Sequence, residues 1–160
     1  IVVHYAQPLN LDAQVVAESS FGGFSLNGMN NSDSSSKYEL KPYDGIRPAH
    51  FVINKPGQLT WKFYAPEAGK YNVDLSFHNA ARNDIECSVS VLDQTLPRQL
   101  KPTGQVVVEP HDHNTDEFVN TRMGNIDIPK RGYYQVTIRF NPDARETLFF
   151  NSIWINKAEK

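Results

Sequence analysis

The sequence predicts an all-β protein that folds as a two-sheet β-sandwich or jelly roll. Three observations lead to this class. Several short runs alternate apolar and polar residues, no window shows a clear helical period, and one Pro-x-x-Gly-x-Tyr phrase occurs twice at the head of such runs. Alternation with period two places one face of a strand on a core and the other toward solvent. A chain made of such strands buries its apolar faces most simply by stacking two sheets.

Length and composition favour one folded domain. The chain has 160 residues, of which 39% are hydrophobic and 11% aromatic, enough for a single substantial core. Its formal net charge of −2 gives no basic surface for nucleic acid. No apolar run is long enough to span a bilayer, so membrane insertion is not expected either.

The alternating runs define the expected strands and their inward rows. In the closing run TLFFNSIWI, the inward parity slips by one residue between Phe150 and Ile153, which predicts a β-bulge. The lone cysteine, Cys87, shares an inward row with apolar residues and is interpreted as a buried, inert thiol. Trp61 is predicted to lie in the core. The strands are expected around Leu59–Phe63, Tyr71–Phe77, Ile85–Val91, QVVVEP, Tyr134–Phe140 and TLFFNSIWI.

The repeated phrase begins at Ala65 as APEAGKY and at Ile128 as IPKRGYY. A proline removes a ladder donor at the end of a strand, and a glycine can take the positive φ that a reversal requires. The aromatic residue then restarts an inward row. Each copy is therefore predicted to be a hairpin.

Two segments interrupt the alternation. Residues 19–50 are rich in Gly, Ser, Asn and Asp, and residues 109–120 read EPHDHNTDEFVN. Long irregular loops in a small domain are commonly functional, and a sandwich gathers its loops at its ends. We therefore expect the two segments to converge on one site. Residues 1–13 are interpreted as a linker or the trailing edge of a preceding domain, and residues 14–160 as the sandwich.

The order of these pieces resembles the carbohydrate-binding modules of families 6 and 35, which are β-jelly rolls of the galactose-binding type. The resemblance covers residues 14–157 and rests on the pair Ala17-Glu18, the run GQLTWKFYAPEAGKYNVDLSF, then TDEF, IDIPKRGYYQVTIRF and FNSIWI. The opening IVVHYAQPLNLDAQ resembles the end of the catalytic domain of an α-L-fucosidase-like glycoside hydrolase.

The resemblance implies a sugar site built from loops. An aromatic residue from the early loop and one from the late loop would grip a pyranose, and an Asn before the last strand would hydrogen-bond its hydroxyls. These roles fall on Tyr43, Phe118 and Asn151, with Asp44, Asn120 and Arg122 as nearby polar candidates. Phe118 stands where these families more often have Trp. The resemblance also implies a structural calcium at Glu18, although Ile153 stands where the partner Asp is expected.

Each of these residues also has a plain structural interpretation. Tyr43 and Phe118 can plug the end of the sandwich, and Asn151 can stabilise the bulge. Trp154 can be a surface platform for sugar or can pack under a loop. His111 and His113 are two residues apart, so their rings can share a face and bind a metal, with Asp116 and Glu117 nearby; a solvated polar loop is the alternative.

The function predicted from the sequence is a non-catalytic carbohydrate-binding module of a secreted, periplasmic or cell-surface glycoside hydrolase. Its expected partners are a glycan or monosaccharide and the catalytic domain of the same polypeptide, and calcium is its candidate cofactor. One alternative is a structural β-domain that packs on the catalytic domain and has no ligand. The other is a metal-dependent lyase or hydrolase that uses the loop at His111 and His113.

Overall fold

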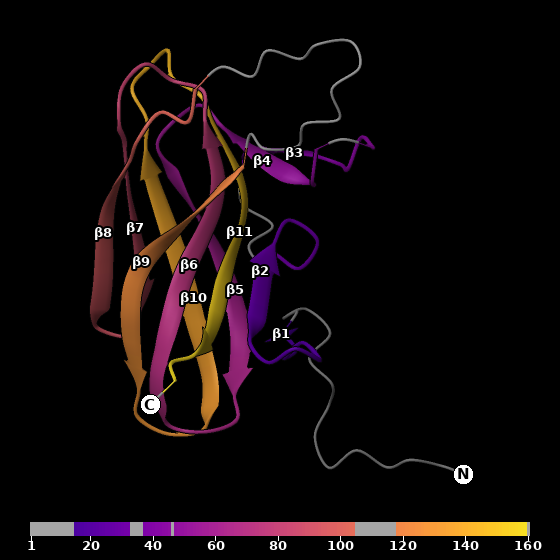
Figure 1. The fold of residues 1–160 in the computed structure, drawn as a ribbon, viewed down its shortest axis with the longest axis vertical. Helices are drawn as coiled ribbons and strands as arrows, with labels where there is room; N and C mark the ends of the chain where they lie inside the picture. Colours follow the sequence, from indigo (N-terminus) through magenta and orange to yellow (C-terminus); the bar gives the residue numbers. More distant parts are fainter. Residues whose placement is uncertain (1–14, 33–36, 46, 105–117, 160) are drawn as a thin grey trace.

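The computed structural model describes residues 15–32, 37–45, 47–104 and 118–159 (Figure 1). No helix in this part of the chain is long and apolar enough to cross a membrane. The described residues form strands only: β1 (Val15–Val16), β2 (Phe24–Asn27), β3 (Glu39–Lys41), β4 (His50–Ile53), β5 (Gly57–Ala65), β6 (Gly69–Asn79), β7 (Ile85–Val91), β8 (Gln94–Leu100), β9 (Val119–Ile128), β10 (Gly132–Asn141) and β11 (Leu148–Lys157).

These strands form two sheets that face each other across one core. The five-stranded sheet has the order β1-β5-β10-β7-β8, and the six-stranded sheet has the order β3-β4-β11-β6-β9, with β2 also on β11. The six-stranded sheet faces the viewer in Figure 1. β4 pairs with the first residues of β11, and β2 pairs further along the same side. The predicted all-β, two-sheet sandwich is confirmed.

The core contains the inward rows of both sheets. Trp61, Phe63, Leu75 and Ile153 are completely buried, and Cys87 is only 2% exposed. The indole N–H of Trp61 donates to the carbonyl of Asn27 at 2.9 Å, which satisfies its one polar group. The predictions for Trp61 and Cys87 are therefore confirmed.

The predicted hairpins are wrong. β5 and β6 are joined by the first copy of the repeated phrase, yet they lie in different sheets, and so do β9 and β10. Each copy is an arch that carries the chain from one sheet to the other. β5 pairs with β10 and β6 pairs with β9, so the two arches lie side by side. Alternation shows only which face of a strand is buried. A hairpin within one sheet and an arch between two sheets bury the same faces, so alternation cannot distinguish them.

Two local predictions have different outcomes. The pairing of β11 with β6 shifts between Phe150 and Ser152, which confirms the bulge and leaves Asn151 as the extra residue. The early segment is not one irregular loop, because it contains β2, β3 and the start of β4. Its short strands were missed because polar and glycine residues dominate their surroundings. The segment QVVVEP lies outside the described residues.

Candidate functional site

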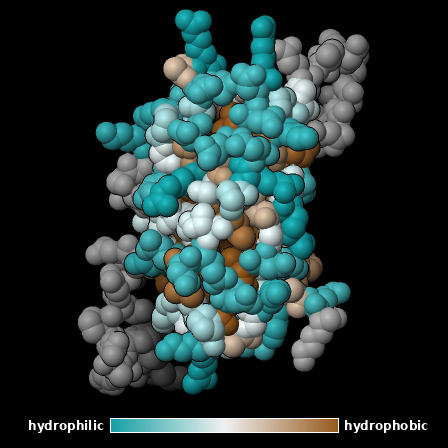
Figure 2. Space-filling model, turned by 90° about the vertical axis from the view of Figure 1, so that its left-hand side faces the viewer, coloured by the Kyte–Doolittle hydropathy of each residue, from teal (hydrophilic) through white to brown (hydrophobic). Residues whose placement is uncertain are grey.

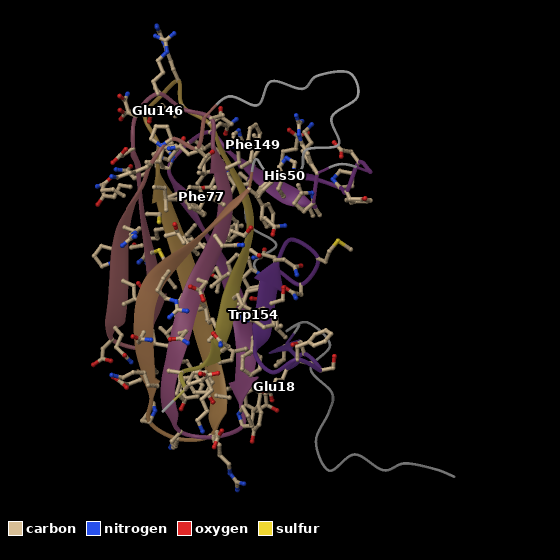
Figure 3. All side chains as sticks on the ribbon, viewed as in Figure 1. Glu18, His50, Phe77, Glu146, Phe149 and Trp154 are labelled. Carbon is tan, nitrogen blue, oxygen red and sulfur yellow. The ribbon has the colours of Figure 1, made fainter. Side chains whose placement is uncertain are left out.

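Aromatic side chains occupy outward positions on the six-stranded sheet. His78 on β6 lies directly opposite Phe149 on β11, and both point away from the core because their neighbours Phe77 and Phe150 point into it. His50 begins β4 on the other side of β11. In Figure 3, His50 and Phe149 lie together in the upper part of this face, well above Trp154.

In the group of His50, His78, Phe118 and Phe149, each histidine ring contacts both phenylalanine rings, and we call these four residues the aromatic cluster. His78 stacks flat on Phe149, with ring centroids 5.6 Å apart and an interplanar angle of 2°. His50 meets Phe149 edge-on at 5.3 Å. Phe118 lies 5.5 Å from His50 and 6.3 Å from His78. The late segment therefore meets the end of the early segment here, as the sequence led us to expect.

Hydrogen bonds fix both histidines of the cluster. Each is only 5% exposed, whereas Phe118 and Phe149 are partly exposed. His50 Nδ1 lies 2.8 Å from the carbonyl oxygen of Pro48, and because a carbonyl only accepts, this nitrogen carries the proton. His78 Nδ1 lies 2.7 Å from the hydroxyl of Thr103. The cluster is thus a rigid floor whose two phenyl rings reach the surface.

Asn151 anchors the neighbouring loop. Its Nδ2 donates to the carbonyl of Ala49 at 2.8 Å, and its Oδ1 accepts from the hydroxyl of Ser152 at 3.0 Å. The bulge of β11 places Asn151 where it can reach across to the end of the connection between β3 and β4, residues 42–49. Both polar ends of the side chain are engaged within the protein. This geometry fits a residue that positions the loop.

Tyr43 and Asp44 lie near the start of this loop, two and three residues after Lys41, which pairs with His50 of the cluster. Tyr43 is 67% exposed, and its hydroxyl donates to the carbonyl of Gly45 at 3.0 Å. Asp44 Oδ1 accepts from the backbone N–H of Arg47 at 2.7 Å, which stabilises the turn. The loop therefore presents an aromatic ring to solvent on a hydrogen-bonded turn.

The polar candidates on β9 divide between two places. Asn120 is exposed, and it pairs across from Ser76, just after Phe118 in the chain. Arg122 lies further along the same outward row, in an ion pair with Asp74 and a 2.9 Å hydrogen bond to the side chain of Asn72. Asn120 therefore borders the aromatic cluster, whereas Arg122 belongs to a separate polar network between β6 and the edge strand β9.

The residues considered for metal binding are far from this site or outside the described residues. Glu18 lies near the lower end of the molecule in Figure 3, where its carboxylate accepts from the N–H of Gly23 at 3.4 Å. Ile153 is completely buried in β11, and its side chain offers no oxygen. Within the described ranges, no group of three or more His, Cys, Asp and Glu could hold a metal ion. Calcium needs several oxygens, and of these two described residues only Glu18 supplies a carboxylate.

His111, His113, Asp116 and Glu117 lie outside the described residues. Trp154 is partly buried on the outer face of β11, with the backbone of Gly23 against its ring. This contact matches the prediction that Trp154 packs under a loop.

Three members of the aromatic cluster were missed from the sequence. The parity of TLFFNSIWI identifies Phe149 as an aromatic residue in an outward row, and His78 follows a buried Phe77 in the same way. The sequence did contain a signal for these two residues: each is aromatic at an outward position, where alternation predicts a polar residue. His50 carried no such signal, because β4 was not predicted.

Comparison with known proteins identifies the fold. No protein-family model matches the sequence, and no curated protein matches it. Solved structures do match. Over most of its length the chain superposes on two-sheet sandwiches of carbohydrate-binding modules and of insecticidal crystal toxins, with sequence identities that show the fold alone.

A family 6 module from the lichenase 5A of Cellvibrio mixtus, in complex with cellotriose, has a TM-score of 0.57 and 13% identity, covering 84% of this chain and 97% of that one. A family 35 module from Clostridium thermocellum has a TM-score of 0.62 and 9% identity, covering 85% and 98%. The insecticidal crystal protein Cry2Aa has a TM-score of 0.68 and 11% identity, covering 89% of this chain but only 23% of the toxin. The chain thus shares the carbohydrate-binding-module β-sandwich expected from the sequence.

Proposed function

We propose that this chain is a non-catalytic carbohydrate-binding module that binds glycan at the aromatic cluster. One observation carries the proposal: two partly exposed phenyl rings, Phe118 and Phe149, pack on buried histidines, and the loop that carries the exposed Tyr43 begins and ends at the pair Lys41–His50. A pyranose presents an apolar C–H face that packs well on such rings. The neighbouring amide of Asn120 and the hydroxyls of Ser76 and Ser152 supply partners for sugar hydroxyls.

The arrangement suits binding without chemistry. An open sheet face beside a loop leaves a sugar partly solvated, so a single site of this kind binds weakly. Weak binding is sufficient when the module is tethered to a catalytic domain, because the tether keeps the enzyme at a high local concentration of its substrate. We infer that the module serves a glycoside hydrolase in this way, outside the cytoplasm. The family 6 neighbour solved with cellotriose supports the choice of a glycan ligand.

A glycan-array screen of the whole chain, with and without chelator, tests the proposal. The double variant Tyr43→Ala, Phe118→Ala should lose the bound glycans while keeping the circular dichroism spectrum of the parent. Tyr133→Ala is the matched control, because Tyr133 is 73% exposed on the opposite sheet and its loss should leave binding unchanged. If the parent binds no glycan, the proposal fails. Binding that survives in the folded double variant would move the site away from the aromatic cluster.

A second candidate function is a structural β-domain that packs on a neighbouring domain. It is favoured by an exposed apolar strip on the outer face of the five-stranded sheet. Tyr64 and Tyr133 are directly opposite each other on β5 and β10, their rings 5.0 Å apart, and Val15 lies on the adjacent β1. Their exposed fractions are 39%, 73% and 39%. Such a patch commonly marks a protein interface. If Tyr133→Ala weakened docking to the catalytic domain while no glycan bound, this candidate would replace the first.

A further inference from the structure

The edge strands β8 and β9 border one side of the sandwich. Each is the last strand of its sheet, and both lie at the left in Figure 1. Their lower parts are joined, because the side-chain amide of Gln94 makes two hydrogen bonds to the backbone of Asp127, at 2.8 and 2.7 Å. Leu96 then lies over Gly124, where an added Cβ would come within 3.2 Å of it.

Above this contact the two strands separate around a cleft of about 610 Å³. Its volume lies within the range typical of small-molecule sites. The apolar side chains of Phe77, Leu100 and Val119 line it, together with the polar Arg98, Lys101 and Thr121. Figure 2 looks straight at this edge and shows apolar surface between hydrophilic flanks.

Polar residues interrupt the inward rows at this cleft. On β8, Arg98 lies opposite Cys87, in the row that also contains Leu96 and Leu100, and therefore faces the space between the sheets. On β9, Thr121 lies opposite the buried Leu75. A charge in an inward row has a high desolvation cost unless the space beside it is wet or holds a counter-charge.

The described residues that line the cleft carry a net positive charge. Arg98 and Lys101 are both exposed, and within the described residues neither makes a hydrogen bond or ion pair through its side chain. No Asp or Glu of the described ranges lines the cleft. An inward-pointing charge also protects an edge strand from association, but β8 already contains Pro97 for that purpose. A second cation and a cleft are not needed to protect an edge.

We propose that this cleft binds an acidic sugar residue, with Arg98 and Lys101 holding its carboxylate or sulfate. A guanidinium offers a planar fork that matches either anion, and an ammonium adds a point charge. The C–H face of the ring lies on the partly exposed Val119, and the hydroxyl of Thr121 meets a ring hydroxyl. The choice of a sugar rests on the proposed glycan-binding function. The cleft adjoins the aromatic cluster, since Thr103 lines it and bonds His78, but none of the four cluster rings lines it.

A titration of the isotope-labelled full chain, followed by amide NMR shifts, tests the proposal. The probes are sodium glucuronate, sodium galacturonate, glucose 6-sulfate and neutral glucose. Saturable shifts at Gln99, Lys101 and Thr121 are expected with an acidic probe and not with glucose, and the comparison of probes distinguishes carboxylate from sulfate. Arg98→Gln should weaken this binding by about tenfold or more, since a charged hydrogen bond is lost. Lys130→Gln, an exposed cation outside the cleft, is the control.

The same spectra separate this proposal from the proposed function. Shifts at His50 and Phe149 with neutral oligosaccharides report on the aromatic cluster, because neither residue lines the cleft. The cleft proposal is overturned if no acidic probe shifts the cleft amides, or if Arg98→Gln binds as well as the parent. Should Arg98→Leu self-associate while the parent binds no acidic probe, the charge protects the edge and the proposal is likewise wrong.

Discussion

Tyr71 and Tyr134 make the same hydrogen bond in the two arches of the sandwich. The phenol of Tyr71 donates to the carbonyl of Glu67 at 3.0 Å, and the phenol of Tyr134 donates to the carbonyl of Lys130 at 2.6 Å. Both rings are nearly buried. Each tyrosine therefore ties the start of a strand back to the turn that carries the chain between the sheets.

Removing either phenol should destabilise the fold without changing it. Tyr71→Phe and Tyr134→Phe each leave a turn carbonyl without its partner, and each should lower the free energy of unfolding by about 1 kcal/mol. Urea denaturation measures the change as a lower midpoint at constant slope. Tyr133→Phe, next to Tyr134 but exposed, should show no change. Equal stability of all three variants would mean that the two bonds contribute nothing.

The loop packed on Trp154 should be sensitive to a single methyl group. Gly23 has a φ of 97°, and a Cβ there would come within 2.8 Å of the Ile155 carbonyl and 3.0 Å of the Trp154 ring. Gly23→Ala should therefore cost about 2 kcal/mol or more, and should shift the fluorescence of Trp154. Gly22 has a φ of 74° but no neighbour within 4 Å, so Gly22→Ala carries only the backbone strain. Equal costs for the two variants would contradict the contact.

Burial should make stability fall at alkaline pH. It raises the pKa of the Cys87 thiol from 9.0 to about 12, and that of the Tyr38 hydroxyl from 10.0 to about 12. Between those values the unfolded chain loses protons that the folded chain keeps. Stability is therefore fully present below pH 9 and falls as the pH rises, by at most about 1.4 kcal/mol per pH unit for Cys87.

Unfolding free energies at pH 8 and pH 10 measure this loss. Cys87→Ala should start from lower stability, because it leaves a small cavity, but should lose less between the two pH values. In the parent, a thiol reagent at pH 8 should react only after urea is added. A Cys87 that reacts at once in the folded protein would show that the thiol is accessible.

Asn151 should affect glycan binding through the loop that it anchors. Its side chain is committed to Ala49 and Ser152, so Asn151→Ala should weaken binding by releasing the loop that presents Tyr43. Calorimetry on the two single variants and the double variant with Tyr43→Ala forms a cycle. If Asn151 only positions Tyr43, the double variant binds no worse than Tyr43→Ala alone. Additive losses would instead indicate that Asn151 contacts the sugar directly.

The fold class was predictable because alternation reports on burial, which each strand carries in its own sequence. Trp61, Cys87 and the bulge at Asn151 were read correctly for this reason. Pairing is a property of two strands, and the three residues from Pro66 to Ala68 can close a hairpin or bridge two sheets. The hairpin prediction was wrong because the sequence does not distinguish these two connections. The repeat itself marked both arches correctly.

The candidate site was predictable only in part. Phe118 and Asn151 lie where the early and late segments meet, as expected, but whether they bind sugar is still a prediction. His78 and Phe149 belong to the site because they pair across β6 and β11, although about 70 residues separate them in the chain. Sequence spacing carries no trace of such a pair. The inward-facing Arg98 was missed because β8 was not predicted.

The two described ends of the chain both lie in the lower half of the sandwich (Figure 1), which has a practical consequence. Val16 pairs with Phe63 just before one arch, and the N–H of Ala158 donates to the carbonyl of Lys70 just after it. From there the aromatic cluster is roughly 25 Å away along β11, at about 3.3 Å per residue. A dye, a sensor chip or a second protein attached just after β11 therefore leaves the proposed glycan surface pointing away from the attachment, so the orientation of the immobilised molecule follows from where it is attached.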